Sequence, residues 1–205
     1  MISKYAITMF AAAVVAAMAA VGSSTIAVAE KPAALGVAAQ KDTLTVETCG
    51  GKSIELKAEE KKSLDLHNAK RKAKDLKPFC VNTILTQAAR DHAQDMIDRD
   101  YFAHNSPEGK TPSDRLKKAG YITRDFSYWT VGENIAWGSG ELGAPDNIFE
   151  AWMDSDGHRH NILDEDFRQI GIGMSQGDFE TRDGNVYAGS RMYAAEFGAR
   201  REKTR

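Results

Sequence analysis

The stretch WMDSDGHRHNIL, at residues 152–163, is the part of this chain that decides its fold. Two earlier stretches share its character: FAHNSPEG at residues 102–109 and GENIA at residues 132–136. In all three, a histidine or a glutamate lies close to a glycine, an aromatic residue or an amide. Because glycine permits backbone conformations that other residues avoid, such neighbours are typical of a backbone shaped to present a functional side chain. We therefore predict one site that draws its residues from these three stretches.

Helices are predicted before and between these stretches, because apolar residues recur there at three- and four-residue spacing. The first is expected over residues 58–76, with Pro78 ending it and an apolar face formed by Leu66, Ala69, Ala73 and Leu76. Asn82 is the expected cap of the next helix. The buried face of that helix should consist of Leu85, Ala88, Ala89, His92 and Met96. On this face, His92 is interpreted as a packed histidine.

Two further helices are predicted by their end signals. Thr111 and Asp114 form a capping pair around Pro112, which is typical of a helix start, and Gly120 ends this helix. Another helix should run from Pro145 to about Ser155, with Gly157 ending it.

Strands dominate the rest of the pattern. Polarity alternates over residues 169–175, where Gly171 and Gly173 leave room for a close neighbour. Asp183-Gly184 predicts a hairpin turn into a long last strand over residues 185–197, and another strand is expected around residue 133. Residues 43–49 and 52–56 predict a small separate hairpin. The sequence thus predicts an α+β fold, with helices on both faces of a mostly antiparallel sheet and an N-terminal β-hairpin.

The N-terminal segment indicates export. Lys4 is the only charged residue before Glu30, and an alanine-rich apolar run leads to Ala27-Val28-Ala29, which resembles a signal-peptidase site. We therefore expect residues 1–29 to be a signal peptide and residues 30–42 a flexible lead-in. An uncleaved membrane anchor is the competing interpretation. In an exported chain, the two cysteines, Cys49 and Cys80, are expected to form a disulfide.

The charge balance argues against a nucleic-acid-binding protein. Lys and Arg number 27 against 29 Asp and Glu, a formal net charge of −2, whereas nucleic-acid binding requires a basic stripe. The one local basic cluster, Lys70, Arg71, Lys72 and Lys74, is interpreted as a solvated helix face.

The three stretches, in this order, resemble the CAP superfamily (SCP/PR-1-like secreted domains) in its bacterial form. Shorter motifs extend the resemblance over about residues 62–198: Asn68-x-x-Arg71, Asp114-Arg115-Leu116, Gly120-Tyr121, Phe167–Gly173 and Glu196-Phe197-Gly198. The resemblance implies a three-layer α-β-α sandwich. It places the CAP domain at residues 62–200, preceded at 43–61 by an accessory hairpin and the start of a helix.

The resemblance also implies a central cleft. CAP domains carry two histidines and two acidic residues there, and the motifs assign His104, His158 and Glu133 to this set. Many eukaryotic members have a second glutamate where this chain has Ser155. The expected cleft is therefore His104, Glu133, Ser155 and His158.

Two imidazoles are suitable zinc ligands, so His104 and His158 form the predicted metal site. With only two protein ligands, Zn²⁺ should bind weakly, and Glu133 could orient a metal-bound water or accept its proton. A purely structural role for these residues is the alternative. A third interpretation is a hydrolase in which Ser155, His158 and Glu133 form a triad, although no Gly-x-Ser-x-Gly turn is present. His160 is expected to be a rim or packing residue.

The expectation for function is an exported CAP-domain protein that binds or signals without catalysis. Its ligand would be a divalent cation, a lipid-like molecule or a component of the cell envelope. A metal- or serine-dependent hydrolase is the alternative, and a ligand-free extracellular scaffold is the third possibility. We expect a secreted monomer that has no membrane span after cleavage and does not bind nucleic acid.

Overall fold

The structure is a computed structural model, and it describes residues 43–203. The predicted signal peptide and lead-in lie outside these residues. Within them, no helix combines the length and apolar character needed to cross a membrane.

A four-stranded sheet in the order β3-β5-β6-β4 is the middle layer of the fold. Its strands are β3 (Cys80–Val81), β4 (Phe126–Gly138), β5 (Gln169–Glu180) and β6 (Val186–Glu202). Only the short β3 runs parallel to its neighbour, and the other pairs are antiparallel. The hairpin of β1 (Thr43–Glu47) and β2 (Ser53–Lys57) forms a separate sheet, as predicted.

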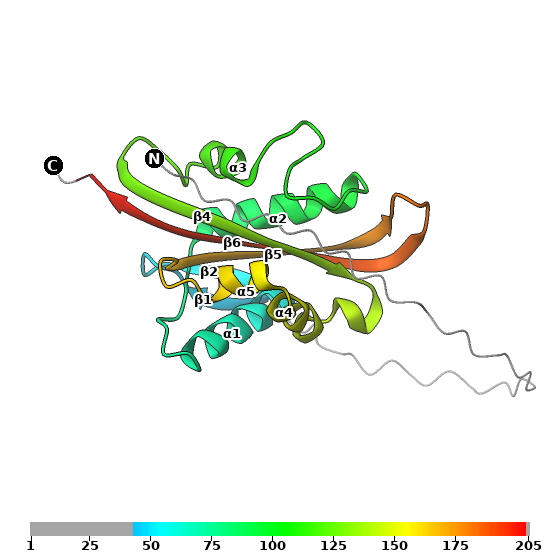
Figure 1. Ribbon diagram of the computed structural model, residues 1–205, viewed down its shortest axis with the longest axis horizontal. Helices are drawn as coiled ribbons and strands as arrows, with labels where there is room; N and C mark the ends of the chain where they lie inside the picture. Colours follow the sequence, from blue (N-terminus) through cyan, green and yellow to red (C-terminus); the bar gives the residue numbers. More distant parts are fainter. Residues whose placement is uncertain (1–42, 204–205) are drawn as a thin grey trace, which may run out of the picture.

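Helices cover both faces of this sheet, which gives the predicted three-layer α-β-α sandwich (Figure 1). One face carries α2 (Thr83–Asp98) and α3 (Pro112–Lys118). The other carries α1 (Ala58–Lys72), α4 (Pro145–Asp154) and α5 (Asp156–Leu163), and a short 3₁₀ helix, η1 (Gly140–Gly143), leads into α4. The predicted mixture of helices and strands is therefore confirmed.

The predicted close approach of a neighbour to the two glycines of β5 is confirmed, and the neighbour is α2. A Cβ atom on Gly171 would lie 2.1 Å from the backbone of Leu85 and Thr86, and one on Gly173 would lie 2.2 Å from the backbone of Arg90. Helix α2 therefore packs directly on the β5 backbone. The Asn82 side chain caps this helix by accepting from the Ile84 and Leu85 amides at 3.0 and 3.2 Å.

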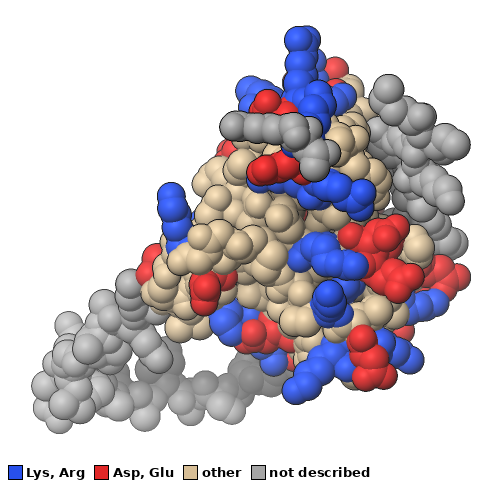
Figure 2. All heavy atoms as spheres, turned by 90° about the vertical axis from the view of Figure 1, so that its left-hand side faces the viewer, with Lys and Arg blue, Asp and Glu red and all other residues tan. Residues whose placement is uncertain are grey.

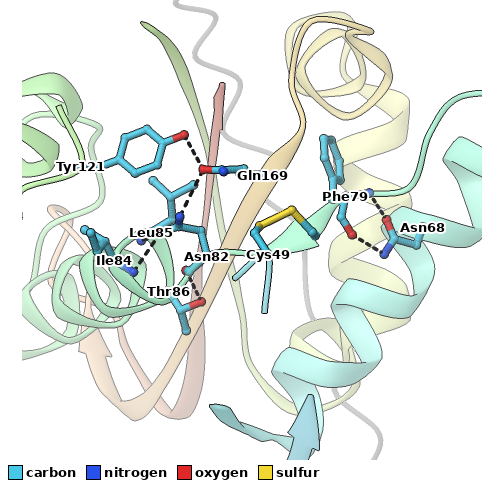
Figure 3. The surroundings of a disulfide bond; sticks show 10 residues. Cys49, Asn68, Phe79, Asn82, Ile84, Leu85, Thr86, Tyr121 and Gln169 are labelled. Carbon is cyan, nitrogen blue, oxygen red and sulfur yellow. Dashed lines mark hydrogen bonds between the residues drawn. A yellow bond between two sulfur atoms is a disulfide. The ribbon is translucent and has the colours of Figure 1, made fainter. Parts of the chain in front are cut away.

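The disulfide between Cys49 and Cys80 is present, as predicted, and joins the hairpin to β3 (Figure 3). On the same side of the molecule, the side chain of Asn68 on α1 makes two hydrogen bonds to the backbone of Phe79. Its Nδ2 donates to the Phe79 carbonyl at 3.1 Å, and its Oδ1 accepts from the Phe79 backbone N–H at 2.7 Å. The start of β3 is thus fixed both by the disulfide and by α1.

The prediction for α1 was wrong in its end and in its buried face. The helix ends at Lys72, and Ala69 and Ala73 are exposed. Its buried residues are Glu60, Ser63, Leu64, His67 and Arg71. Arg71 was assigned to a solvated face, but it is fully buried and donates to the carbonyls of Lys77, Ile162, Asp164 and Phe167.

The prediction that Gly157 ends a helix was also wrong. Helix α4 ends at Asp154, and Ser155 is the single extended residue before α5 begins at Asp156. Gly157 therefore lies in the first turn of α5. As a result, Ser155 and His158 lie at the junction of two helices rather than at the end of one.

Candidate functional site

Glu133 is the centre of the site and lies on β4, facing the α2 and α3 layer. Its side chain is only 1% exposed. His104, from the loop after α2, shares a hydrogen bond between its Nδ1 and Glu133 Oε1 at 2.6 Å. Since Nδ1 is occupied by Glu133, the Nε2 atom is the ring nitrogen of His104 that is left for a ligand. This is the arrangement in which a carboxylate fixes the orientation of a metal-binding histidine.

Arg115 on α3 holds the same carboxylate from its other side. Its Nη2 pairs with Glu133 Oε2, and its Nη1 donates to the His104 carbonyl at 2.7 Å. One arginine therefore fixes both the glutamate and the loop that carries the histidine. Burial disfavours the charge on Glu133, but the hydrogen bond from His104 and the charge of Arg115 outweigh it and lower the pKa of this carboxyl. Glu133 is therefore ionised at neutral pH.

His92 is a packed, buried histidine, as predicted, and it borders this cluster. Its Nε2 lies 3.7 Å from Glu133 Oε2, and its Nδ1 lies 3.4 Å from the Tyr101 hydroxyl. Burial lowers the pKa of His92 to about 4, although the negative charge of Glu133 opposes this. A neutral His92 therefore closes the buried side of the site.

Glu196 is a second buried carboxyl beside Glu133, because the two residues are cross-strand partners on β6 and β4. Neither of its carboxyl oxygens accepts a hydrogen bond from a described residue, and Arg115 Nη2 lies 3.8 Å away. Burial, followed by the charge of Glu133, raises the pKa of Glu196 well above its usual value. A protonated Glu196 can donate to Glu133, whereas two adjacent buried carboxylates would repel each other.

Helix α5 is attached to the site by two asparagines. Asn134, next to Glu133, donates to the His158 carbonyl at 3.0 Å. Asn161 donates to the Asn134 side chain at 2.9 Å and to the Glu133 carbonyl at 3.4 Å. Asn161 therefore binds both the backbone and a side chain of β4. These bonds set the position of His158 relative to the strand.

His158 is partly buried, and a charged His104 acts on it electrostatically. The pKa of His158 is lowered, first by burial and then by the charge of His104. A neutral imidazole is the form that binds metals. By contrast, the side chain of His160 is 67% exposed, so His160 does not contribute to the buried cluster.

Ser155 occupies the junction between α4 and α5 in an ordinary extended conformation, with φ −96° and ψ 123°. Among residues 43–203, no hydrogen bond joins its hydroxyl to a histidine, and no three His, Cys, Asp or Glu side chains are grouped as a metal-binding set. His104 and His158 are the residues that would hold a metal here.

Of the residues in the cluster, Arg115 and Glu196 were not predicted as site residues. Both belong to motifs that carry the family resemblance, Asp114-Arg115-Leu116 and Glu196-Phe197-Gly198. The motifs gave no indication that a buried Glu196 and a partly buried Arg115 lie next to Glu133.

The model of the cysteine-rich secretory protein (CAP) family matches residues 64–188. The chain belongs to this family. It is 41% identical over 147 residues to the uncharacterized protein YkwD of Bacillus subtilis (strain 168), and the alignment covers 70% of this chain and 54% of that protein. The CAP chain therefore spans about half the length of this relative.

Solved structures have the same fold. An extracellular protein containing an SCP domain from Bacillus anthracis str. Ames matches with a TM-score of 0.52 and 28% identity, over 68% of this chain and 39% of that chain. An outer surface protein from Borrelia burgdorferi matches with a TM-score of 0.53 over 78% of this chain and 99% of that chain. Its 19% identity supports a likeness of fold alone.

Proposed function

We propose that this CAP-domain protein is an exported binding module whose cleft captures a divalent cation of the zinc type through His104 and His158. The proposal rests on the pairing of the Glu133 carboxylate: one of its oxygens is bonded to His104 and the other to Arg115. A carboxylate held in this way orients the His104 ring and leaves Nε2 available. Because it is buried and paired, it is a poor general base.

The donor set fits a weak site. Two neutral imidazoles bind Zn²⁺, but a stable structural zinc site has four protein ligands. Ser155 occupies the position at which other members of the family have an acidic residue. The cleft of this chain therefore has one negatively charged group fewer than a cleft with two glutamates, and it should bind a cation more weakly. Protonation of the histidines should release the metal as pH falls. Such a cleft suits reversible capture of a cation, or of a ligand that brings its own donor atom.

Calorimetric titration of the purified protein with Zn²⁺ at neutral pH tests the cleft. We expect weak binding that His104→Ala abolishes. Glu133→Gln should weaken it roughly 10- to 100-fold, the usual effect of losing the partner that orients a ligating histidine. His160→Ala is the matched control, because His160 is an exposed histidine on the same helix as His158. Equal losses in His104→Ala and His160→Ala, or no binding by the parent protein, would reject the site.

The hydrolase alternative makes a different prediction. A nucleophilic serine needs a base within hydrogen-bond reach, and the structure gives Ser155 no bond to His158. We expect a fluorophosphonate probe to leave the protein unlabelled. Stoichiometric labelling of Ser155 that is lost in His158→Ala would establish the hydrolase instead.

Export is the second part of the proposal. The disulfide is typical of an oxidising compartment, and the Bacillus anthracis protein of similar structure is extracellular by its description. The intact mass of protein recovered from a culture medium tests this, since it should correspond to a chain that begins at Glu30. A mass that includes residues 1–29 would contradict cleavage.

A further inference from the structure

A hollow of about 240 Å³ lies at the end of the central sheet where β4 and β5 begin and β6 ends. It is lined by Tyr128, Asp166, Arg168, Ala199, Arg200 and Arg201. Figure 2 looks onto this end of the molecule, where groups of Lys and Arg side chains, interspersed with Asp and Glu side chains, border an uncharged band. Tyr128 precedes Glu133 by five residues on β4, which is roughly 16 Å of strand. The hollow is therefore separate from the His104 cleft.

Strand register shows which side chains can reach the hollow. Tyr128 is the cross-strand partner of Arg201, and Ala199 lies two residues before Arg201 on the same face of β6. Arg168 precedes Gln169, the partner of Gly198, so it lies opposite Ala199. Arg168, Arg201 and Tyr128 therefore surround the small side chain of Ala199.

Arg200 belongs to the opposite face of the sheet. Its guanidinium lies 4.5 Å from the centre of the Tyr121 ring and 4.4 Å from that of Phe126, and its Nη1 donates to the Tyr121 carbonyl at 2.8 Å. Arg200 borders the hollow but its charged group is already engaged. The guanidinium groups left for a ligand are those of Arg168 and Arg201.

Cationic groups outnumber acidic groups in the lining of the hollow, which holds Arg168, Arg200 and Arg201 against Asp166. Arg168 and the buried Arg71 both donate to the Phe167 carbonyl, at 3.0 and 3.3 Å, so two like charges share one neutral acceptor. Arg201 lies 5.8 Å from the centre of the Tyr128 ring and forms no ion pair with a described residue. Asp166 is the one acidic residue in the lining. An excess of cationic groups around an open volume favours an anionic ligand.

We propose that this hollow binds a phosphate group carried on a small polyol or sugar. A phosphate offers acceptor oxygens in several directions, so it can pair with guanidinium groups on two sides of Ala199, and the guanidinium fork matches its geometry. The hollow has room for about eight water molecules at ~30 Å³ each, which exceeds a single ion. The Tyr128 ring, 44% exposed, gives the carbon face of the attached group an apolar surface.

Calorimetric titration of the full chain with glycerol 3-phosphate and with inorganic phosphate tests the proposal. We expect the organic phosphate to bind more tightly, because it fills more of the hollow. Arg168→Gln and Arg201→Gln should each weaken binding tenfold or more, since each removes a charged donor. Arg182→Gln is the matched control: it removes the same charge from an exposed arginine in the β5–β6 turn, beyond the far end of β5. Equal losses in all three variants would show only diffuse attraction and overturn the proposal.

Two further variants separate the shape of the hollow from its charge. Asp166→Asn should tighten phosphate binding several-fold, because it removes the one negative charge in the lining. Ala199→Leu should fill the hollow and abolish binding with every charge retained, provided that its thermal unfolding matches that of the parent protein. Unchanged binding in Ala199→Leu would contradict a built site.

Binding measurements also test where the phosphate comes from and whether the hollow binds it independently of the His104 cleft. Binding of soluble glycerol 3-phosphate supports a soluble or polymer-borne phosphate. Retention only on phosphatidylglycerol vesicles, lost in Arg201→Gln, assigns the phosphate to a lipid headgroup. His104→Ala should leave phosphate binding unchanged, so failure of the zinc site leaves this inference standing. Loss of phosphate binding in His104→Ala would overturn a separate site.

Discussion

Glu133 and Glu196 are buried side by side, and Arg115 supplies the one guanidinium near both of them within the described structure. Removing two carboxylates from water costs several kcal/mol each, and a single cation cannot neutralise both. The site resolves this conflict by unequal protonation. Glu133 takes the bonds from Arg115 and His104 and stays ionised, while Glu196 keeps its proton.

This division predicts a pH dependence of stability that originates at Glu196. Its raised pKa means that the folded protein holds a proton that the unfolded chain releases near pH ~4.3. The free energy of unfolding should therefore decrease as pH rises above that value, towards the pKa of Glu196 in the folded protein. Glu196→Gln removes the titration and supplies an amide that can donate to Glu133.

We expect Glu196→Gln to be more stable than the parent protein at pH 8, by about 1.4 kcal/mol for each unit by which folding raises the pKa of Glu196, because the parent must take up a proton to fold and the variant does not. The two proteins should converge near pH 4. Urea unfolding at several pH values measures both. If the parent protein is the more stable one at pH 8, Glu196 is ionised and paired with Arg115, and the proposed protonation is wrong.

At the scale of single residues, the sequence predicted the central residues of the site more reliably than the residues that surround them. His104 and Glu133 were predicted from their motifs, and the structure joins them directly. Arg115 and Glu196 were not predicted as site residues, because an arginine in a helix and a glutamate in a strand are usually solvated. The packing of α3 and β6 against β4 buries Glu196 completely and leaves the Arg115 side chain 16% exposed.

At the scale of elements, the same limit explains the error in α1. Its leucines and alanines predicted the buried face, yet Glu60 and Arg71 are fully buried while Ala69 and Ala73 are exposed. Arg90 pairs with Glu60 at 2.5 Å, and carbonyls at the end of α5 and in the loop after it accept hydrogen bonds from Arg71. Hydrophobic periodicity cannot detect polar residues whose partners lie far away in sequence. By contrast, the start of α3 depends on the local pair Thr111 and Asp114, and it was predicted correctly.

The packing of α2 on β5 is the element-scale prediction. A methyl group on Gly171 would lie 2.1 Å from the α2 backbone, so Gly171→Ala forces the helix away from the sheet. We expect a loss of about 3 kcal/mol or more in the free energy of unfolding, at the upper end of overpacking costs, because backbone atoms cannot move aside as side chains do. Gly50→Ala is the control, since nothing lies within 4 Å of its added Cβ. Chemical denaturation that gives equal stabilities for the two variants would contradict this packing.

At the scale of the whole molecule, the fold class and the separate hairpin follow from the order of periodic segments and turn signals. Helices come first and long strands last, so the late strands pair with each other and with the strand that carries Glu133. The split between α4 and α5 was not predictable in this way. Gly157 is tolerated in the first turn of α5, where the hydrogen bonds from Asn134 and Asn161 fix the helix to β4.

The Cys49–Cys80 disulfide leads to a prediction for the whole molecule. The hairpin is also held without it: Cys49 donates its amide to the Val81 carbonyl at 2.8 Å, and Leu56 is buried in the main core. Replacing both cysteines by serine should therefore leave the fold intact and mainly enlarge the conformational freedom of the unfolded chain. For a separation of 31 residues, the expected loss in the free energy of unfolding is about 4 kcal/mol. Urea unfolding of the double variant measures this loss, and circular dichroism checks that the native spectrum is kept. A changed spectrum would show that the disulfide positions the hairpin, and an unchanged stability would show that the unfolded chain gains no freedom when the cross-link is removed.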